Sequence, residues 1–205
     1  MDRIPGVVLD DVWRDMSLDD KIAIAAQLKD YFDQLRAIPP PKSPSICSVT
    51  GGPIICSRLH AHMEWCGPYR DEEHLNTQLR RRHPVEDFDP VVQASQKLAH
   101  PLVFTHNDFS PRNVMVMETP AGWKVTGIID WECAGWLPSY WDYCKAVNWN
   151  ALNASCGLWN WEGWIPKIIE PFEQPKRISS CAGQTIDQPR PDAPDKQGLD
   201  EIDKP

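Results

Sequence analysis

Apolar residues recur every three or four positions in the segment that follows Ser17. They are Leu18, Ile22, Ala25, Leu28, Phe32 and Leu35. This spacing is typical of a helix that buries one face. Ser17 and Asp20 form a plausible capping pair at its start, and three consecutive prolines at 39–41 end it. The pattern therefore predicts a helix from about Ser17 to Leu35.

Two more helices are predicted before residue 100. Three acidic residues open the segment 71–82, which ends before a proline, and Asp89–Pro90 opens the segment 89–98. Proline suits the first helical position, because its missing N–H would have no partner there. Between these helices and the first one, residues 43–68 are rich in Gly, Pro and Ser, and 48–54 predicts a short hairpin or a loop.

The periodicity changes after residue 100. Three short apolar runs predict strands at 102–105, 114–117 and 125–129. A Pro-Ala-Gly turn separates the last two, which makes them a hairpin. From Pro138 the pattern is helical again, and a further helix is predicted within 161–172.

Composition and charge exclude several classes of protein. The net charge of the 205-residue chain is −8, whereas a general nucleic-acid binder needs basic surface to neutralise phosphates. Neither an apolar run of about 18 residues nor a signal-peptide pattern is present, so no membrane association is expected. Seven cysteines without paired spacing indicate reduced thiols and a cytoplasmic protein.

The chain ends in a segment of different character. Residues 176–205 contain no aromatic residue, four prolines and mixed charges. Such a composition buries too little apolar surface to offset the entropy of ordering the chain. We therefore expect a disordered tail.

Polar residues with the chemistry of phosphoryl transfer stand between the predicted strands. His106, Asp108 and Asn113 form an H-x-D-x-x-x-x-N loop after the first strand, and Asp130 follows the hairpin. Phosphoryl transfer needs one carboxylate to orient the acceptor hydroxyl and take its proton. It also needs hard oxygen ligands for Mg²⁺ at the nucleotide phosphates. Asp108 fits the first role, and Asn113 and Asp130 fit the metal roles.

These motifs resemble the aminoglycoside phosphotransferase family, and more narrowly its kinase-like members in fungi. The resemblance rests on 106–108, 111–113, 129–132, 134–135 and 138–142, and it extends more weakly over residues 4–172. Asn107 stands where the family usually has glycine, and asparagine tolerates the left-handed backbone that such a position requires.

The resemblance implies an α+β, protein-kinase-like C-terminal lobe that is mainly helical with a small β-hairpin. The expected organisation is a hinge-following segment at 1–16, the lobe at 17–175 and the tail at 176–205. It also implies ATP and Mg²⁺ as cofactors and a small-molecule hydroxyl as the acceptor. In the family, the motif at residues 5–13 follows the hinge, so the nucleotide-binding N-lobe with its glycine-rich strands and lysine is expected to be missing.

The missing lobe leaves an alternative function open. The chain is either a phosphotransferase with weak nucleotide binding or a catalytically inactive module for binding or scaffolding, including an incomplete gene model. The lobe face would expose apolar surface, so self-association is expected.

Other polar and aromatic residues allow two interpretations. In the resembling folds His106 is chiefly architectural, and Asp142 at a helix start favours capping. Arg112 and Glu132 fit either a site or an exposed surface. The tryptophans, concentrated in the second half of the chain, favour core packing over stacking on a substrate. His60, His62 and Cys66 match no common zinc spacing.

Overall fold

A computed structural model describes residues 3–42, 45–56, 59, 65–152 and 161–171. Its helices are α1 (Leu9–Trp13), α2 (Leu18–Arg36), α3 (Glu72–Leu79), α4 (Pro90–Ser95), α5 (Trp141–Leu152) and α6 (Ile165–Ile168). Its strands are β1 (Val7–Val8), β2 (Cys47–Ser48), β3 (Ile54–Ile55), β4 (Trp65–Cys66), β5 (Leu102–Thr105), β6 (Val114–Thr119), β7 (Gly122–Ile128) and β8 (Gly135–Pro138). Short 3-10 turns include η1 (Val85–Asp87), η2 (Pro111–Asn113), η3 (Trp131–Cys133) and η5 (Trp161–Gly163).

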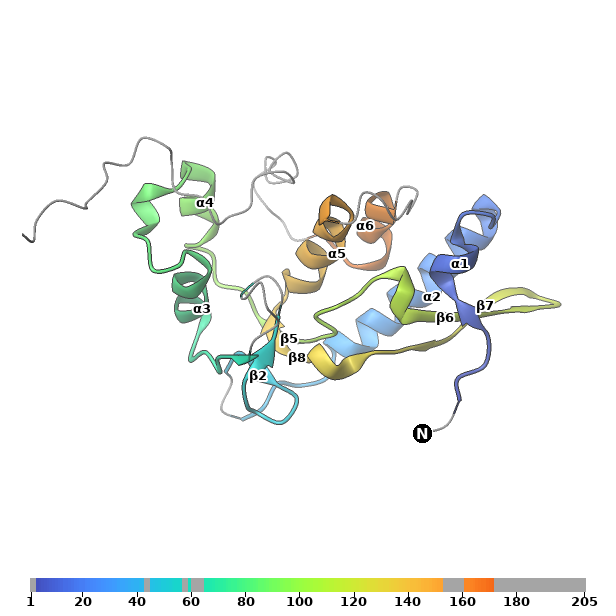
Figure 1. Cartoon of the computed structure of the whole chain (residues 1–205), viewed down its shortest axis with the longest axis horizontal. Coiled ribbons are helices and arrows are strands. Elements are labelled where there is room, and N and C mark those ends of the chain that lie inside the picture. The colour runs from blue at the N-terminus through green and yellow to red at the C-terminus, as the bar shows by residue number, and fades with distance from the viewer. Residues whose placement is uncertain (1–2, 43–44, 57–58, 60–64, 153–160, 172–205) are drawn as a thin grey trace, which may run out of the picture.

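The strands form small antiparallel sheets that share the molecule with the helices. The orders are β1-β6-β7, β2-β8-β5 and β3-β4. At one end of the molecule the β6–β7 hairpin lies beside α1 and α2, and at the other end lie α3 and α4 (Figure 1). The fold is thus mixed α and β, as an α+β class requires, but the prediction of a mainly helical molecule is not confirmed.

The helix predicted after Ser17 is confirmed as α2, with one change in its buried face. The hydroxyl of Ser17 accepts a hydrogen bond from the backbone N–H of Asp20 at 3.1 Å, as the capping pair predicts. Ala25, Leu28 and Phe32 are buried, but Leu18 and Ile22 are 65% and 50% exposed, while Ile24 is fully buried. The first two turns of α2 therefore present a different face to the core than the periodicity predicts.

The predicted hairpin is confirmed, and both of its strands reach closer to the turn than predicted. Val114 pairs with Ile128 at one end of β6–β7, and Thr119 pairs with Gly122 beside the turn. Asp71 and Asp89 cap α3 and α4 as their sequence positions predict, accepting bonds from the N–H groups of His74 and Val91.

Several short strands, among them β1, β4 and β8, were not predicted from the sequence, and β8 matters most for the site. β8 lies in the middle of its sheet and pairs with β5 on one side and with β2 on the other. A Cβ atom at Gly135 would lie 2.3 Å from the carbonyl oxygen of Cys47, so the close approach of β2 requires glycine. Residues 48–54 form a turn rather than a hairpin of their own, since Ser48 pairs with Gly135 and Ile54 with Cys66.

Most of the described tryptophans pack inside the molecule, as predicted. The ring of Trp13 meets the rings of Trp161 and Trp164 edge to face at 5.3 and 5.4 Å. Trp141 is fully buried in a second cluster with Leu75 and Leu137. Between them these clusters fix α5 and α6 against the rest of the chain, which places the start of α5 beside the site described below.

Two further expectations concern the C-terminal tail and membrane-spanning helices. The predicted tail at 176–205 lies outside the described residues. None of the described helices is long and apolar enough to cross a membrane.

Candidate functional site

The loop 106–113, between β5 and β6, carries most of the predicted site. Asn107 has a left-handed backbone with φ 62°, a conformation that asparagine adopts more readily than most residues. The loop ends in the 3-10 turn η2, which opens with a proline and leads directly into β6. The predicted combination of strand, loop and strand is therefore present.

The side chain of Asn107 anchors the loop to three other segments. Its Nδ2 donates to the carbonyl oxygens of Ile55 at 3.0 Å and Cys133 at 2.9 Å. Its Oδ1 accepts from Nε1 of Trp141 at 2.8 Å. Asn107 is fully buried, so each of these bonds replaces one to water. The side chain of Asn107 thus makes three hydrogen bonds that glycine, which has no side chain, could not make.

Asp142, at the start of α5, binds the backbone of the loop through its carboxylate. Its carboxylate accepts hydrogen bonds from the backbone N–H groups of His106 at 3.0 Å and Asn107 at 2.8 Å. Burial raises the pKa of Asp142, while His106 and these two backbone bonds act in the opposite direction. From the first turn of α5, this carboxylate therefore binds the backbone of the loop, a role that the capping interpretation did not include.

His106 joins the loop to the segment that carries Asp130. Its Nδ1 accepts from the backbone N–H of Asp108 at 3.2 Å. A ring nitrogen that accepts carries no proton, so Nε2 bears the hydrogen and donates to the carbonyl oxygen of Ile129 at 2.9 Å. The architectural interpretation of His106 agrees with these contacts.

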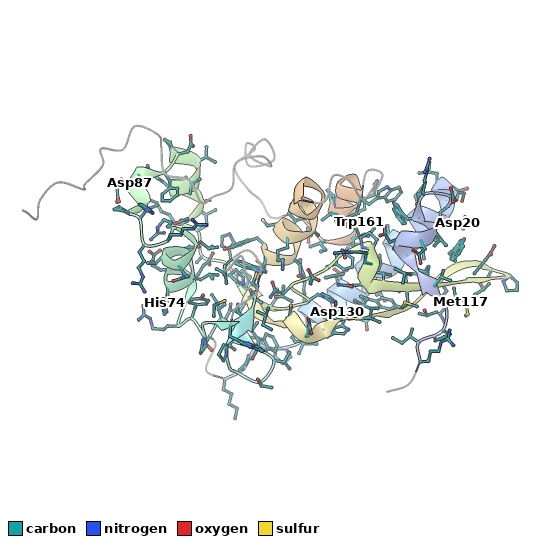
Figure 2. All side chains as sticks on the ribbon, in the orientation of Figure 1. Asp20, His74, Asp87, Met117, Asp130 and Trp161 are labelled. Carbon is teal, nitrogen blue, oxygen red and sulfur yellow. The ribbon has the colours of Figure 1, made fainter. Side chains whose placement is uncertain are left out.

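Asp108 and Asn113 lie in direct contact, and the chain next to Asp130 is bonded to them. Nδ2 of Asn113 donates to the carbonyl oxygen of Asp108 at 2.8 Å and to its Oδ2 at 3.3 Å. The carbonyl oxygen of Asn113 accepts from the N–H of Ile129 at 2.9 Å. Asp130 itself has a left-handed backbone, φ 66° and ψ 56°, and is exposed. Figure 2 places it near the middle of the molecule, with Met117 farther out along the hairpin.

The chemistry of two side chains here fits a magnesium ion. Because Nδ2 of Asn113 is fixed on Asp108, its Oδ1 is the atom that remains for a cation. This oxygen and the exposed carboxylate of Asp130 would be hard ligands of the kind that Mg²⁺ takes, one or two from the protein and the rest from water and phosphate oxygens. Among the residues that the structure describes, no cluster of three or more His, Cys, Asp or Glu side chains could hold a metal.

A cation that the sequence analysis did not single out stands beside Asp108. Nζ of Lys145, in α5, lies 4.0 Å from Oδ1 of Asp108 and donates to the carbonyl oxygen of Asn107. Lys145 follows Asp142 by three positions, a spacing that places both on one helix face. The three-residue spacing from Asp142 is therefore the sequence feature from which Lys145 could have been predicted to face the loop.

The thiol of Cys133 is influenced by the charges of Lys145, Asp108 and Glu132. Burial raises the pKa of its thiol to about 11, Lys145 acts to lower it, and Asp108 and Glu132 act to raise it. Cys133 is the last residue of η3, and its carbonyl oxygen accepts the bond from Nδ2 of Asn107 in the loop. Its buried position makes it an unreactive thiol at neutral pH.

The other candidate residues from the sequence lie either on the exposed surface or in packing contacts. Glu132 is exposed, and Arg112 is exposed and acts to lower the pKa of Asp10, whose burial raises it. The ring of Trp131 lies 4.5 Å from that of His106. His60 and His62 of the zinc alternative lie outside the described residues, and Cys66 donates instead to the carbonyl oxygen of Ile54 at 3.4 Å.

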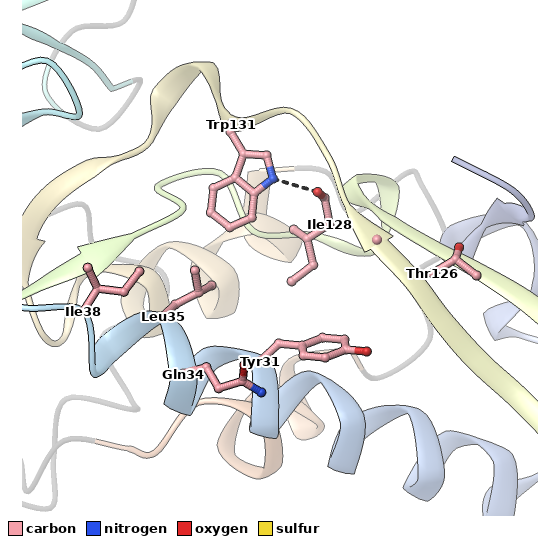
Figure 3. Close-up of a pocket in the computed structure, with 8 residues that line it drawn as sticks. Tyr31, Gln34, Leu35, Ile38, Thr126, Ile128 and Trp131 are labelled. Atoms are coloured by element: carbon pink, nitrogen blue, oxygen red, sulfur yellow. Dashed lines mark hydrogen bonds between the residues drawn. The ribbon is translucent and has the colours of Figure 1, made fainter. Parts of the chain in front are cut away.

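A shallow pocket opens next to Trp131, between α2 and β7. It has a volume of about 450 Å³ and is lined by Tyr31, Gln34, Leu35, Ile38, Thr126, Gly127, Ile128 and Trp131. Trp131 donates from Nε1 to the carbonyl oxygen of Ile128 at 2.7 Å and covers one side of the pocket (Figure 3). The pocket thus adjoins the segment of Asp130 but contains neither Asp108 nor Asn113.

Comparison with known proteins adds one finding to this geometry. The sequence model of the phosphotransferase enzyme family matches residues 1–166. That range includes the loop 106–113, the hairpin, Asp130 and Lys145. A search of curated proteins finds no match.

Proposed function

The chain belongs to the phosphotransferase enzyme family, and on this basis we propose that it transfers the γ-phosphoryl group of ATP to a hydroxyl of a small molecule. The family match supports phosphoryl transfer, while the donor, the acceptor class and the residue roles are our proposal. The observation that carries it is the contact between the Asp108 carboxylate and the Asn113 amide, with the Asp130 segment bonded to Asn113.

In the proposed reaction Asp108 orients the acceptor hydroxyl and takes its proton. The acceptor oxygen forms a bond to the γ-phosphorus as the bond to the bridging oxygen of the nucleotide breaks, and ADP leaves. The proton then passes from Asp108 to solvent. Asp108 is partly exposed, so an acceptor can reach it. Most catalysis of this kind comes from positioning and charge neutralisation.

Asn113 and Asp130 would hold Mg²⁺, which supplies positive charge to the phosphate oxygens when bound. His106, Asn107 and Asp142 would keep the loop in shape. We further propose that residues 17–175 form the larger lobe of a kinase-like fold, following a hinge-adjacent segment at 1–16. The β6–β7 hairpin, with one candidate metal residue before it and one after it, supports this assignment.

The test uses the 205-residue chain, Mg-ATP labelled at the γ-phosphate and acceptors that include amino sugars, choline-like alcohols and small neutral alcohols. We expect label transfer to at least one acceptor and a loss of about 10²–10⁴-fold in kcat for Asp108→Asn, the range that a general base contributes. Asp130→Asn should raise the Mg²⁺ concentration needed for half-maximal rate. Asp87→Asn is the matched control, because Asp87 lies far from Asp130 in the molecule (Figure 2).

The outcomes separate the enzyme from its alternative. Label transfer that survives Asp108→Asn would contradict the assignment of the base. A folded chain that binds no Mg-ATP in a calorimetric titration and labels no acceptor would contradict the enzyme and favour the inactive binding or scaffolding module.

A further inference from the structure

We propose that Lys145 is a positioning residue for Asp108, an inference that rests on the proposed function. Its ammonium group would hold the Asp108 carboxylate toward the acceptor while the proton is taken. Nothing in the motif pattern or in the family match assigns a role to this lysine.

The first support is geometry. Nζ of Lys145 lies 4.0 Å from Oδ1 of Asp108, while Nδ2 of Asn113 lies 3.3 Å from Oδ2. The two carboxylate oxygens thus face different partners, one from α5 and one from η2. Such a carboxylate is restrained in rotation, and a misplacement of about 1 Å in a catalytic group can cost about 100-fold in rate.

The second support is the way Lys145 is itself held. It donates to the carbonyl oxygen of Asn107, and Asn107 is fixed by its own buried hydrogen bonds. One turn earlier in α5, Asp142 binds the backbone of the same loop. The lysine therefore reaches Asp108 from a rigid helix that is already attached to the loop on both sides of Asn107.

The third support is the electrostatic environment. The Lys145 side chain is only 12% exposed, against 38% for Asp108. Charges act on one another more strongly at such a place than in bulk water. The charge of Lys145 also acts to lower the pKa of the Cys133 thiol, which burial raises.

A purely structural interpretation must be separated from this one. Lys145 could serve only to attach α5 to the loop through the carbonyl oxygen of Asn107. In that case its loss would loosen the whole loop and affect acceptor binding and stability. Positioning of Asp108 would instead affect the transfer step.

The experiment compares the full chain with Lys145→Met, Lys145→Arg and the control Lys124→Met, which makes the same change at an exposed position near the tip of the hairpin. With the acceptor found above, we expect Lys145→Met to lower kcat by about 10–100-fold, with the acceptor KM changed less than about threefold. Lys145→Arg should recover part of the loss, and Lys124→Met should match wild type.

The Cys133 thiol provides a readout that does not depend on turnover. Its alkylation is followed against pH by peptide mass spectrometry in the folded proteins. If Lys145 acts through its charge and the loop stays in place, loss of that charge raises the pKa of the Cys133 thiol. Below about pH 10, where a lysine side chain is protonated, we therefore expect Cys133 to be alkylated more slowly in Lys145→Met than in the wild-type chain. If the loop loosens, the thiol loses its burial and is alkylated faster than in the wild-type chain, which would overturn the proposal.

The remaining outcomes are also decisive. If the wild-type chain turns over and Lys145→Met has the same kcat, this inference is overturned and the proposed function stands. A rise in KM alone, with kcat retained, also overturns it. A folded wild-type chain without turnover overturns both.

Discussion

Asn107 has an unfavourable left-handed backbone conformation, but its side-chain amide is hydrogen-bonded through both its nitrogen and its oxygen. A left-handed conformation costs a non-glycine residue about 1–2 kcal/mol, and glycine would avoid that cost. The three buried hydrogen bonds of the side chain offset it by tying the loop to Ile55, Cys133 and Trp141. The geometry of Asp108 therefore depends on the residue before it.

We expect Asn107→Gly to destabilise the protein, although glycine is the usual residue in the resembling family. The substitution relieves the backbone but removes three hydrogen bonds of the buried Asn107 side chain, and a buried polar group that loses its bond costs about 1–3 kcal/mol. The net loss should be about 2–4 kcal/mol in the free energy of unfolding, measured by urea denaturation. An unchanged midpoint would show that these bonds add nothing to stability.

At the scale of the elements, α2 shows how a correct helix can present an unexpected face. Its length and caps follow from local sequence, but the turn that contacts the core depends on where β7 and α6 lie. Gln27 bonds the edge of β7, accepting from the N–H of Val125 at 2.9 Å and donating to the carbonyl oxygen of Trp123 at 3.1 Å. This contact fixes the rotation of α2, so that Ile24 points inward and Ile22 outward.

The rotation of α2 predicts different costs for two identical substitutions. Ile24→Ala should lower the free energy of unfolding by about 2–5 kcal/mol, as expected for an isoleucine in a packed core. Ile22→Ala removes the same atoms from a side chain that is 50% exposed and should cost less than about 1 kcal/mol. Thermal unfolding of the two variants is the measurement, and equal costs would contradict the observed face of the helix.

At the scale of the whole molecule, apolar side chains are exposed at both ends of α2. Leu18 and Ile22 are exposed one turn apart at its start, and Ile38, two residues past its end, is 42% exposed and lines the pocket. Exposed apolar side chains that lie together mark surfaces that associate. The net charge of −8 opposes this association by mutual repulsion.

We therefore expect the chain to self-associate in a concentration-dependent way. Sedimentation velocity over a dilution series should show a rising average sedimentation coefficient at moderate salt. Ile22→Glu adds a charge beside Leu18 at the start of α2 without touching the core and should weaken the association. A single monomer species at every concentration would contradict this prediction, and an unaffected Ile22→Glu would place the contact elsewhere.

Local chemistry in the sequence determined many of the elements and the candidate residues. The α2 cap, the starts of α3 and α4 and the β6–β7 hairpin depend on neighbours within a few positions, so capping residues, prolines and a turn signal suffice to predict them. The order of Asp108, Asn113 and Asp130 around that hairpin likewise pointed to phosphoryl transfer, because their separation along the chain is short.

The tertiary structure decided what depends on contacts between distant segments. β8 is a strand because β2 and β5 pair with it, and neither lies near it in sequence. Asn107 became an anchor only through residues 26 to 52 positions away. Lys145 meets Asp108 only because Asp142 attaches α5 to the loop. Periodicity and motifs describe neighbours along the chain, whereas pairing, burial and the charges around a site depend on which segments the core brings together.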